Sequence, residues 1–333
     1  MPTAIPRCWN PFSRLVSVHV ESSAPARTRV FEITPARFRA LAFAAAGALY
    51  VIVSTGASVR LTGSGLGCEH WPGCQPGNPF PEKGYHSYIE FGNRIVAGTT
   101  IVLTFLAWLA SRRADGLPRW TPRLALAVFV GTLLQAPLGA LAVYVHLHPV
   151  AVIPHLLLSM LVLGAALLVA LEAISPAAHA VPEELRRAAL VLVGAAFLLV
   201  VTGTFATAAG PHSGGDRVAR FGRLDALLPV HAAGVAVFGL TLVFVVGYLA
   251  AQRHSAPLLF RLAVGLVGIV LLQMGIGELQ YRTHLPWWLV LVHVALAAAV
   301  WGWTVVLAAL LRRTAAPLAV PLSGRAGFAR TSV

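Results

Sequence analysis

The sequence contains little charge. Asp, Glu, Lys and Arg make up 11% of its 333 residues, whereas 57% are hydrophobic and the mean hydropathy is +0.76. A soluble domain carries about 25% charged residues to cover its surface, so this composition excludes an ordinary soluble domain. The net charge of +13 does not indicate a nucleic-acid partner, because the arginines lie between the apolar segments and at both ends of the chain.

Cysteine is also scarce. Of the three in the chain, Cys8 lies near the N-terminus, and Cys68 and Cys74 lie in one loop. Two cysteines alone do not make a strong metal site. The glycines and proline between positions 60 and 74 predict a loop rich in turns. A structural disulfide that closes this loop is the favoured interpretation of the pair, and a redox-active pair is the alternative.

Long hydrophobic segments take the place of charge. Each is near the roughly 20 residues that a helix needs to cross a bilayer. The sequence therefore predicts an all-α integral membrane protein with eight transmembrane helices in contact with membrane lipid. The segments are 39–58, 88–111, 122–146, 150–172, 187–208, 226–250, 258–281 and 286–311.

The arginines predict the orientation in the membrane. They precede the first apolar segment, follow the second and close the eighth, and they share one side if the N-terminus is inside, where basic loops are retained. We therefore expect a cell-membrane protein with a cytoplasmic N-terminal arm (1–38) and a cytoplasmic tail (315–333). The arginine-containing stretch 217–223 goes against this trend. The supporting pairs are Arg37 and Arg39, Arg112 and Arg113, and Arg312 and Arg313.

An internal repeat relates the two halves of the chain, 39–175 and 176–314. One ungapped shift of 138 positions aligns helices 2–4 with helices 6–8, which predicts two pseudosymmetric four-helix bundles. Both halves would enter the membrane from the same side, because each has an even number of helices. Two similar pockets are the functional interpretation, and a duplication that retains only packing is the alternative. The matched pairs are Gln135 with Gln273, Gly139 with Gly277, His146 with His284, His155 with His293, and Asn93 with His231.

Four polar residues are expected at one depth. Asn93, His155, His231 and His293 each lie about five to eight residues into an even-numbered helix, roughly 8–12 Å below its outer end. Two histidines at matched depth in one bundle can supply both axial nitrogens to a haem iron. We therefore predict haem ligation by His231 and His293, with a packing role as the alternative. Zinc fits less well, because no cluster of thiolates or carboxylates accompanies the pair.

The first half has a different set of groups. His155 is paired with Asn93, a poor haem ligand, so one face of a haem would be open or weakly held. Glu90, Asn93 and Arg94 share one face of helix 2. A Glu90–Arg94 ion pair is one interpretation. The other is that Glu90 handles protons or stabilises positive charge over the pocket, while Arg94 holds an anionic group such as a haem propionate. The repeat places Leu228 opposite Glu90, which favours chemistry in the first half only.

Taken together, these residues resemble the haem A synthase (CtaA/Cox15) family. The resemblance rests on the run from Thr62 to Cys74, on Glu90–Arg94, and on the histidines of helices 4, 6 and 8, and it extends over nearly the whole span from helix 1 to helix 8. The family has eight helices in two pseudosymmetric halves and oxidises the C8 methyl of haem O to a formyl group. Membership implies an oxidoreductase in the cell membrane.

The resemblance also implies roles for the residues above. His231 and His293 would ligate a permanent haem b in the C-terminal half, and His155 would ligate the substrate haem in the N-terminal half. Glu90 would match the family's essential carboxylate, and Cys68 with Cys74 its outer-loop disulfide. The expected partners are haem O, haem O synthase and an electron donor.

One departure from the family pattern concerns the substrate site. Many members have histidine where this chain has Asn93, which leaves His155 as the one strong ligand there. Two other functions are compatible with the same residues. A dihaem electron carrier of the quinone or ferric reductase type would need two fully ligated haems and no Glu90. A haem transporter would need a substrate path near the midplane and broken helices.

Overall fold

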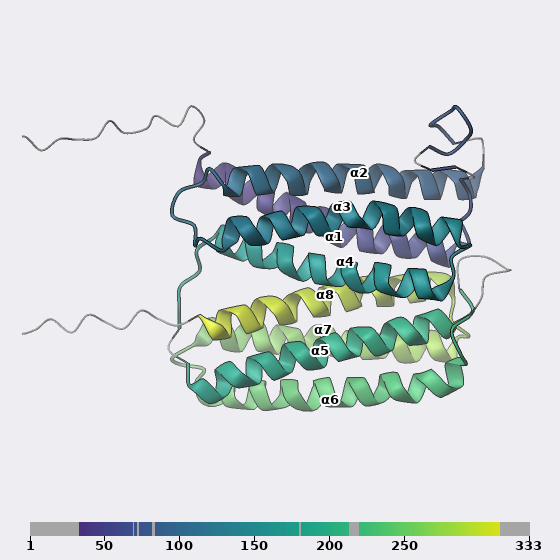
Figure 1. The fold of residues 1–333 in the computed structure, drawn as a ribbon. Helices are drawn as coiled ribbons and strands as arrows, with labels where there is room; N and C mark the ends of the chain where they lie inside the picture. The colour runs from purple at the N-terminus through teal and green to yellow at the C-terminus, as the bar shows by residue number, and fades with distance from the viewer. Residues whose placement is uncertain are drawn as a thin grey trace, which may run out of the picture. The chain divides into compact units, whose positions relative to one another are not determined.

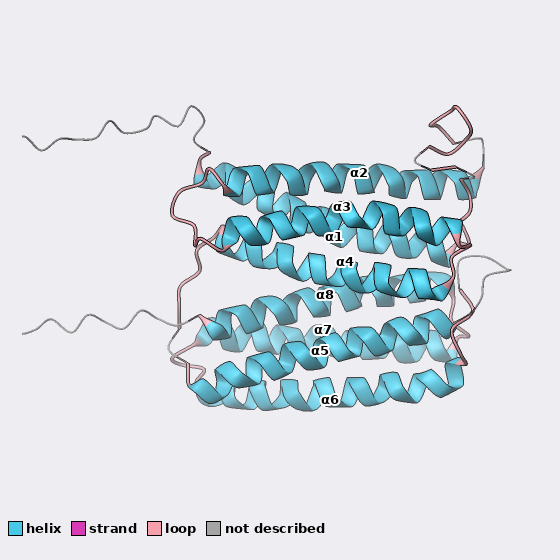
Figure 2. Ribbon diagram, viewed as in Figure 1, coloured by secondary structure: helices cyan, strands magenta, loops and turns pink. Residues whose placement is uncertain are grey.

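The computed structural model describes residues 33–68, 70–71, 73–81, 84–179, 181–212 and 220–313, and this part of the chain contains eight helices and no strand (Figure 2). Each helix is long and apolar enough to cross a membrane, which confirms the predicted fold class. Arg217, the tail 315–333 and most of the N-terminal arm lie outside the described residues. The helices are α1 (Pro35–Leu61), α2 (Tyr85–Ser111), α3 (Thr121–Tyr144), α4 (Pro149–Glu172), α5 (Glu183–Ala209), α6 (Leu224–Ala251), α7 (Pro257–Arg282) and α8 (Trp287–Arg312).

The helices extend slightly beyond most of the apolar segments, and α1 shows why. The side chain of Thr34 caps the helix by accepting a hydrogen bond from the backbone N–H of Arg37 at 3.4 Å. Pro35 follows at the start of the helix, where its missing N–H is not needed. At the other end α1 continues to Leu61, so Arg60 belongs to this helix and not to the loop in which the sequence placed it.

The eight helices form two rings of four. In the first ring α1 packs on α2, α2 on α3, α3 on α4 and α4 on α1, and α5–α8 repeat this order. Among the described helices, diagonal partners within a ring, such as α2 and α4 or α6 and α8, do not pack on each other. The two rings meet where α8 contacts α1 and α4, and where α4 contacts α5 (Figure 1). Exchanging the halves maps these contacts onto themselves, as a pseudo-twofold axis requires.

The seam between the rings is built from small residues. Gly164 on α4 and Gly302 on α8 are related by the same shift of 138 positions. The indole of Trp301 lies over Gly164, where a Cβ would be 3.2 Å from its Nε1, and Nε1 donates a hydrogen bond to the carbonyl of Met160 at 2.6 Å. The side chain of Leu167 lies over Gly302 in the same way. Glycine therefore allows α4 and α8 to approach closely, as it does in other membrane helix pairs.

The repeat also appears in the backbone of the turns. The turn after α3 places His146 and Leu147 at positive φ, 53° and 59°, and the turn after α7 places His284 and Leu285 at 61° and 59°. In both turns the leucine donates its N–H to the carbonyl five residues earlier at 2.7 Å. Two consecutive left-handed residues outside glycine are uncommon. Their recurrence at equivalent positions supports the duplication inferred from sequence.

Apolar side chains cover the outward faces of the bundle. On α6, for example, Leu240 and Val243 are 74% and 67% exposed. In water such faces would be unfavourable, whereas lipid solvates them, and the chain is therefore a multi-pass membrane protein. The start of α1 and the end of α8 lie at the same end of the bundle, as an even number of crossings demands (Figure 1).

Candidate active site

A cavity of about 500 Å³ lies inside the first ring, toward the end that carries the α1–α2 and α3–α4 connections. All four helices of the ring line it, and Thr207 of α5 and Val294 of α8 extend its wall into the second half. The lining is mostly apolar, as is usual for a site that binds an organic molecule of cofactor size. Its polar side chains include Arg60, Glu90, Asn93, Arg94, Thr100, Thr132, Gln135, His155, Ser159 and Thr207.

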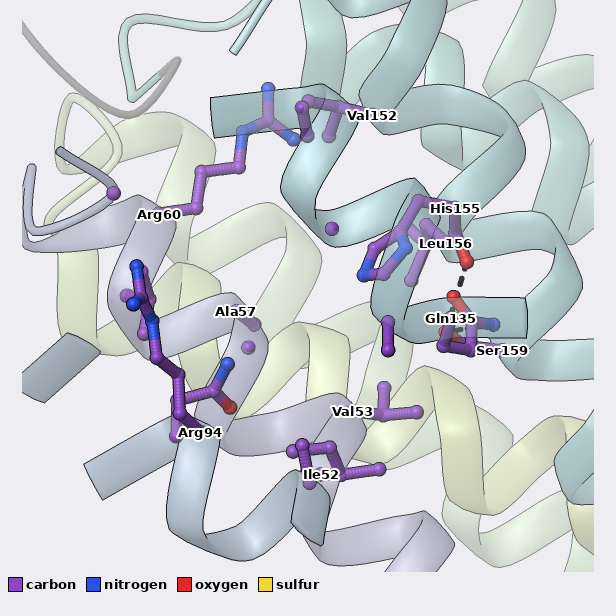
Figure 3. A pocket seen from close by; sticks show the side chains of 18 of the residues that line it. Ile52, Val53, Ala57, Arg60, Arg94, Gln135, Val152, His155, Leu156 and Ser159 are labelled. Atoms are coloured by element: carbon purple, nitrogen blue, oxygen red, sulfur yellow. Dashed lines mark hydrogen bonds between the residues drawn. The ribbon is translucent and has the colours of Figure 1, made fainter. Parts of the chain in front are cut away.

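His155 lies in the cavity wall, where a hydrogen bond to its backbone carbonyl holds its position (Figure 3). Gln135 Nε2 donates to Ser159 Oγ at 3.0 Å, and Ser159 Oγ donates to the carbonyl of His155 at 2.9 Å. Gly139 of α3 faces the ring, and a Cβ there would lie 3.7 Å from Cε1. The imidazole makes no hydrogen bond within the described residues, and its buried Nδ1 has no partner there. A ring nitrogen in this state is suited to bind a metal ion carried by a ligand.

Asn93 is turned toward α1. Its Oδ1 accepts a hydrogen bond from Thr55 Oγ1 at 2.7 Å. An amide oxygen has two lone pairs, and Thr55 uses one of them. Asparagine is a poor haem ligand, and it stays a prediction that His155 is the one strong ligand in the first half.

Glu90 is buried, with 4% of its surface exposed, and both of its carboxylate oxygens are bonded. Oε1 forms an ion pair with Arg94 at 2.5 Å, and Oε2 accepts a hydrogen bond from the backbone N–H of Cys68 at 2.8 Å. Arg94 also donates to the carbonyls of His70 and Gly73. The ion pair expected from the sequence is therefore present, and Glu90 also lines the cavity, while its role in proton handling or charge stabilisation stays a prediction.

The loop that holds Glu90 is closed by a disulfide between Cys68 and Cys74, and both residues are buried. Its backbone lies directly on α2, since a Cβ at Gly67 would be 2.6 Å from the carbonyl carbon of His86. Ser87 Oγ adds a hydrogen bond to the carbonyl of Gly67 at 2.7 Å. The disulfide loop therefore packs onto the start of α2, where the Glu90–Arg94 pair anchors it.

The second ring places two histidines on diagonal helices. His231 is the eighth residue of α6, and His293 is the seventh residue of α8. Their helices, α6 and α8, do not pack on each other in the described part of the chain and lie across the ring from one another. Thr202 Oγ1 lies 3.2 Å from His231 Nδ1, which holds the ring and leaves Nε2 for a ligand.

Glycines opposite these histidines leave room for the rings. A Cβ at Gly203 would lie 3.0 Å from Cε1 of His231, and a Cβ at Gly277 would lie 3.1 Å from Cε1 of His293. Gln273 Nε2 bonds the carbonyl of His293 directly at 3.0 Å, where the first half uses Ser159 as a relay. The buried Nδ1 of His293 has no partner in the described part of the chain. The donor set, one imidazole from each of two diagonal helices, therefore fits a group that takes one imidazole from each side.

Sequence reasoning missed the hydroxyl residues that bond the histidines and Asn93. Thr55, Ser159 and Thr202 are ordinary hydroxyl residues in apolar segments, and nothing in their spacing marks them. Arg60 is different, because a guanidinium at the end of an apolar segment is itself a signal. It was counted as part of a loop, but it lines the cavity and donates from Nη2 to the carbonyl of Thr207 at 2.9 Å.

Comparison with known proteins shows a match to one protein family. The family model COX15-CtaA, described as a cytochrome oxidase assembly protein, matches residues 39–83 and 78–211, which include every residue of the cavity described above except Val294. Proteins named Heme A synthase from Bacillus pumilus and Bacillus licheniformis are 37% and 42% identical over 37% and 28% of this chain. These matches span 40% and 31% of the two relatives. A Heme A synthase from Geobacillus thermodenitrificans is 26% identical over 76% of this chain and 84% of its own length.

Proposed function

Because this chain belongs to the COX15-CtaA family of cytochrome oxidase assembly proteins, we propose that it is a haem A synthase, an oxidoreductase that converts the C8 methyl of haem O into a formyl group. The observation that carries the proposal is the cavity in the first ring, which has one imidazole and one fixed carboxylate in a mostly apolar wall. The equivalent position in the second ring is Leu228, so the carboxylate belongs to one half only.

In this proposal haem O binds in the cavity with His155 as its axial ligand. The volume of about 500 Å³ lies within the range of roughly 300–1,000 Å³ that is usual for organic ligands. Because asparagine is a poor haem ligand, Asn93 would leave the opposite face of the iron without a strong protein ligand. An open face suits a substrate that must react and leave. It also disfavours the dihaem electron carrier, in which both haems are doubly ligated.

Glu90 acts as a fixed negative charge beside the substrate. Its carboxylate accepts one bond from a guanidinium and another from a backbone N–H, and these bonds fix its position. It stabilises positive charge that develops on the substrate, and it needs no reorganisation because Cys68 and Arg94 already hold it. This is the cation-stabilising role expected from the sequence, and the proton-handling role is the alternative.

In the second ring, His231 and His293 hold a permanent haem b between them. When bound, haem b supplies one-electron redox chemistry. Thr202 fixes the ring of His231 through Nδ1, and Gln273 fixes the backbone of His293. Such supports keep axial ligands in one orientation, which suits a cofactor that stays in place. Haem O synthase and an external electron donor are the partners that this assignment requires.

The test compares haem extracted from cells that also express a haem O synthase. Glu90→Gln removes the charge and keeps the shape of the side chain. Glu278→Gln is the matched control, because Glu278 also pairs with an arginine four residues later, Arg282, but is 59% exposed on α7. We expect haem A from the intact chain and from the control, and a fall of roughly 100-fold in the Glu90 variant. Equal haem A in all three would remove Glu90 from the mechanism, and no haem A from the intact chain would refute the function.

A further inference from the structure

The cavity wall contains a second guanidinium, that of Arg60, in the last turn of α1. Its Nη2 donates to the carbonyl of Thr207 on α5, and its buried Nε has no partner among the described residues. In Figure 3 the side chain extends toward Val152 of α4. Arg60 therefore has at least one N–H donor, at Nε, that can bond a molecule in the cavity.

The other guanidinium in the wall, that of Arg94, already bonds groups of the protein. Arg94 bonds Glu90 and the carbonyls of His70 and Gly73, which fixes the disulfide loop to α2. It stays a prediction from the sequence that Arg94 holds an anionic group such as a haem propionate. Of the two cations, Arg60 is the one with a buried donor atom, Nε, that has no partner in the described part of the chain.

A guanidinium in an apolar cavity is unfavourable unless an anion accompanies it. Within the described part of the chain Arg60 joins no ion pair, and the carboxylate that it shares the cavity with, Glu90, is bonded to Arg94 and to the N–H of Cys68. The neutral carbonyl of Thr207 satisfies one donor but leaves the charge uncompensated. An anionic group on the molecule that fills the cavity would compensate it.

We propose that Arg60 binds a propionate carboxylate of the porphyrin substrate. This inference rests on the proposed function, because it needs a porphyrin in the cavity. Arginine matches a carboxylate with two parallel N–H donors. Arg60 lies at the loop end of α1 and His155 lies seven residues into α4, so the carboxylate edge faces the polar end of the cavity while the ring extends inward. In haem O the C8 methyl shares its pyrrole ring with one propionate, so this contact also positions the methyl.

The test is a binding titration of purified protein with two probes, ferric protohaem and its dimethyl ester, which lacks the negative charges. Binding is followed by the Soret difference spectrum, so the readout does not depend on turnover. We expect the intact chain to prefer the free acid about tenfold, Arg60→Gln to lose most of this preference, and Arg60→Lys to keep part of it. Arg282→Gln, which changes an exposed arginine on α7, serves as the matched control and keeps the full preference.

A His155→Ala variant tests the proposed porphyrin site separately from the proposed contact between Arg60 and the propionate. If that change abolishes the titration while Arg60→Gln keeps the intact preference for the free acid, the Arg60 assignment is wrong and the substrate site stands. If His155→Ala leaves the titration unchanged, the cavity is not the porphyrin site and both proposals fail. Helix content by circular dichroism and elution as a single species show that each variant is folded.

Discussion

At the scale of single residues, the two halves place equivalent histidines in different surroundings. His293 and His155 both face a glycine on the preceding helix, and a glutamine supports the backbone of each, directly in one case and through Ser159 in the other. The difference lies in the diagonal partner, which is His231 in one ring and Asn93 in the other. The residue at this one position therefore distinguishes the two sites. With His231 the ring offers two imidazole ligands, and with Asn93 it offers one.

This difference predicts unequal effects of histidine substitutions. Replacing His231 or His293 with alanine removes one of two axial nitrogens, and we expect purified protein to lose most of its permanently bound haem. His155→Ala changes the substrate site and keeps that haem. Reduced-minus-oxidised spectra and the ratio of haem to protein measure the effect, with exposed His284→Ala as the control. Full Soret absorbance after both His231 and His293 are replaced would contradict haem ligation by this pair.

At the scale of elements, the disulfide loop and α2 form one unit. The bonds from Arg94 and from the N–H of Cys68 converge on Glu90, so the loop sets the position of the carboxylate as much as the helix does. Burial of the charge is tolerable because both oxygens are bonded. A change in the loop therefore acts on the cavity wall directly.

The α4–α8 seam allows a stability prediction at this scale. Gly164→Leu places a side chain under Trp301, which is 5% exposed and fixed by its bond to Met160. We expect a loss of about 1–3 kcal/mol from overpacking. Gly239→Leu on α6 is the control, because a Cβ there meets nothing within 4 Å and the gain in helix propensity is the same. Equal thermal unfolding of the two variants in detergent would show that the seam is not closely packed.

At the scale of the whole molecule, the proposed orientation has both termini in the cytoplasm. Alkaline phosphatase, which is active only outside, can be fused after Gly77 in the α1–α2 connection or after Gly116 in the α2–α3 connection. Because arginines accompany the second connection, we expect activity from the fusion at Gly77 and none from the fusion at Gly116. The reverse result would place the cavity at the cytoplasmic face.

The sequence predicts much of this architecture, for identifiable reasons. Apolar segments long enough to cross a bilayer have few alternatives to a helix, so all eight helices were predicted. The repeat was visible because the 138-residue shift contains no gap. The rotation of each helix about its axis depends on packing, and sequence does not specify it. That is why the sequence did not show that Cys68 donates its N–H to Glu90, that Thr202 faces His231, or that Arg60 lines the cavity.

The arrangement of the seam has a consequence for the origin of the chain. A contact surface that maps onto itself when the halves are exchanged is isologous, the kind that joins two identical subunits. Gly164 and Gly302 would then descend from one glycine at the dyad of an ancestral homodimer of four-helix subunits. Fusion of two gene copies would have allowed the two subunits to diverge. One half could then retain a permanent haem while the other came to bind and release a substrate, as proposed above.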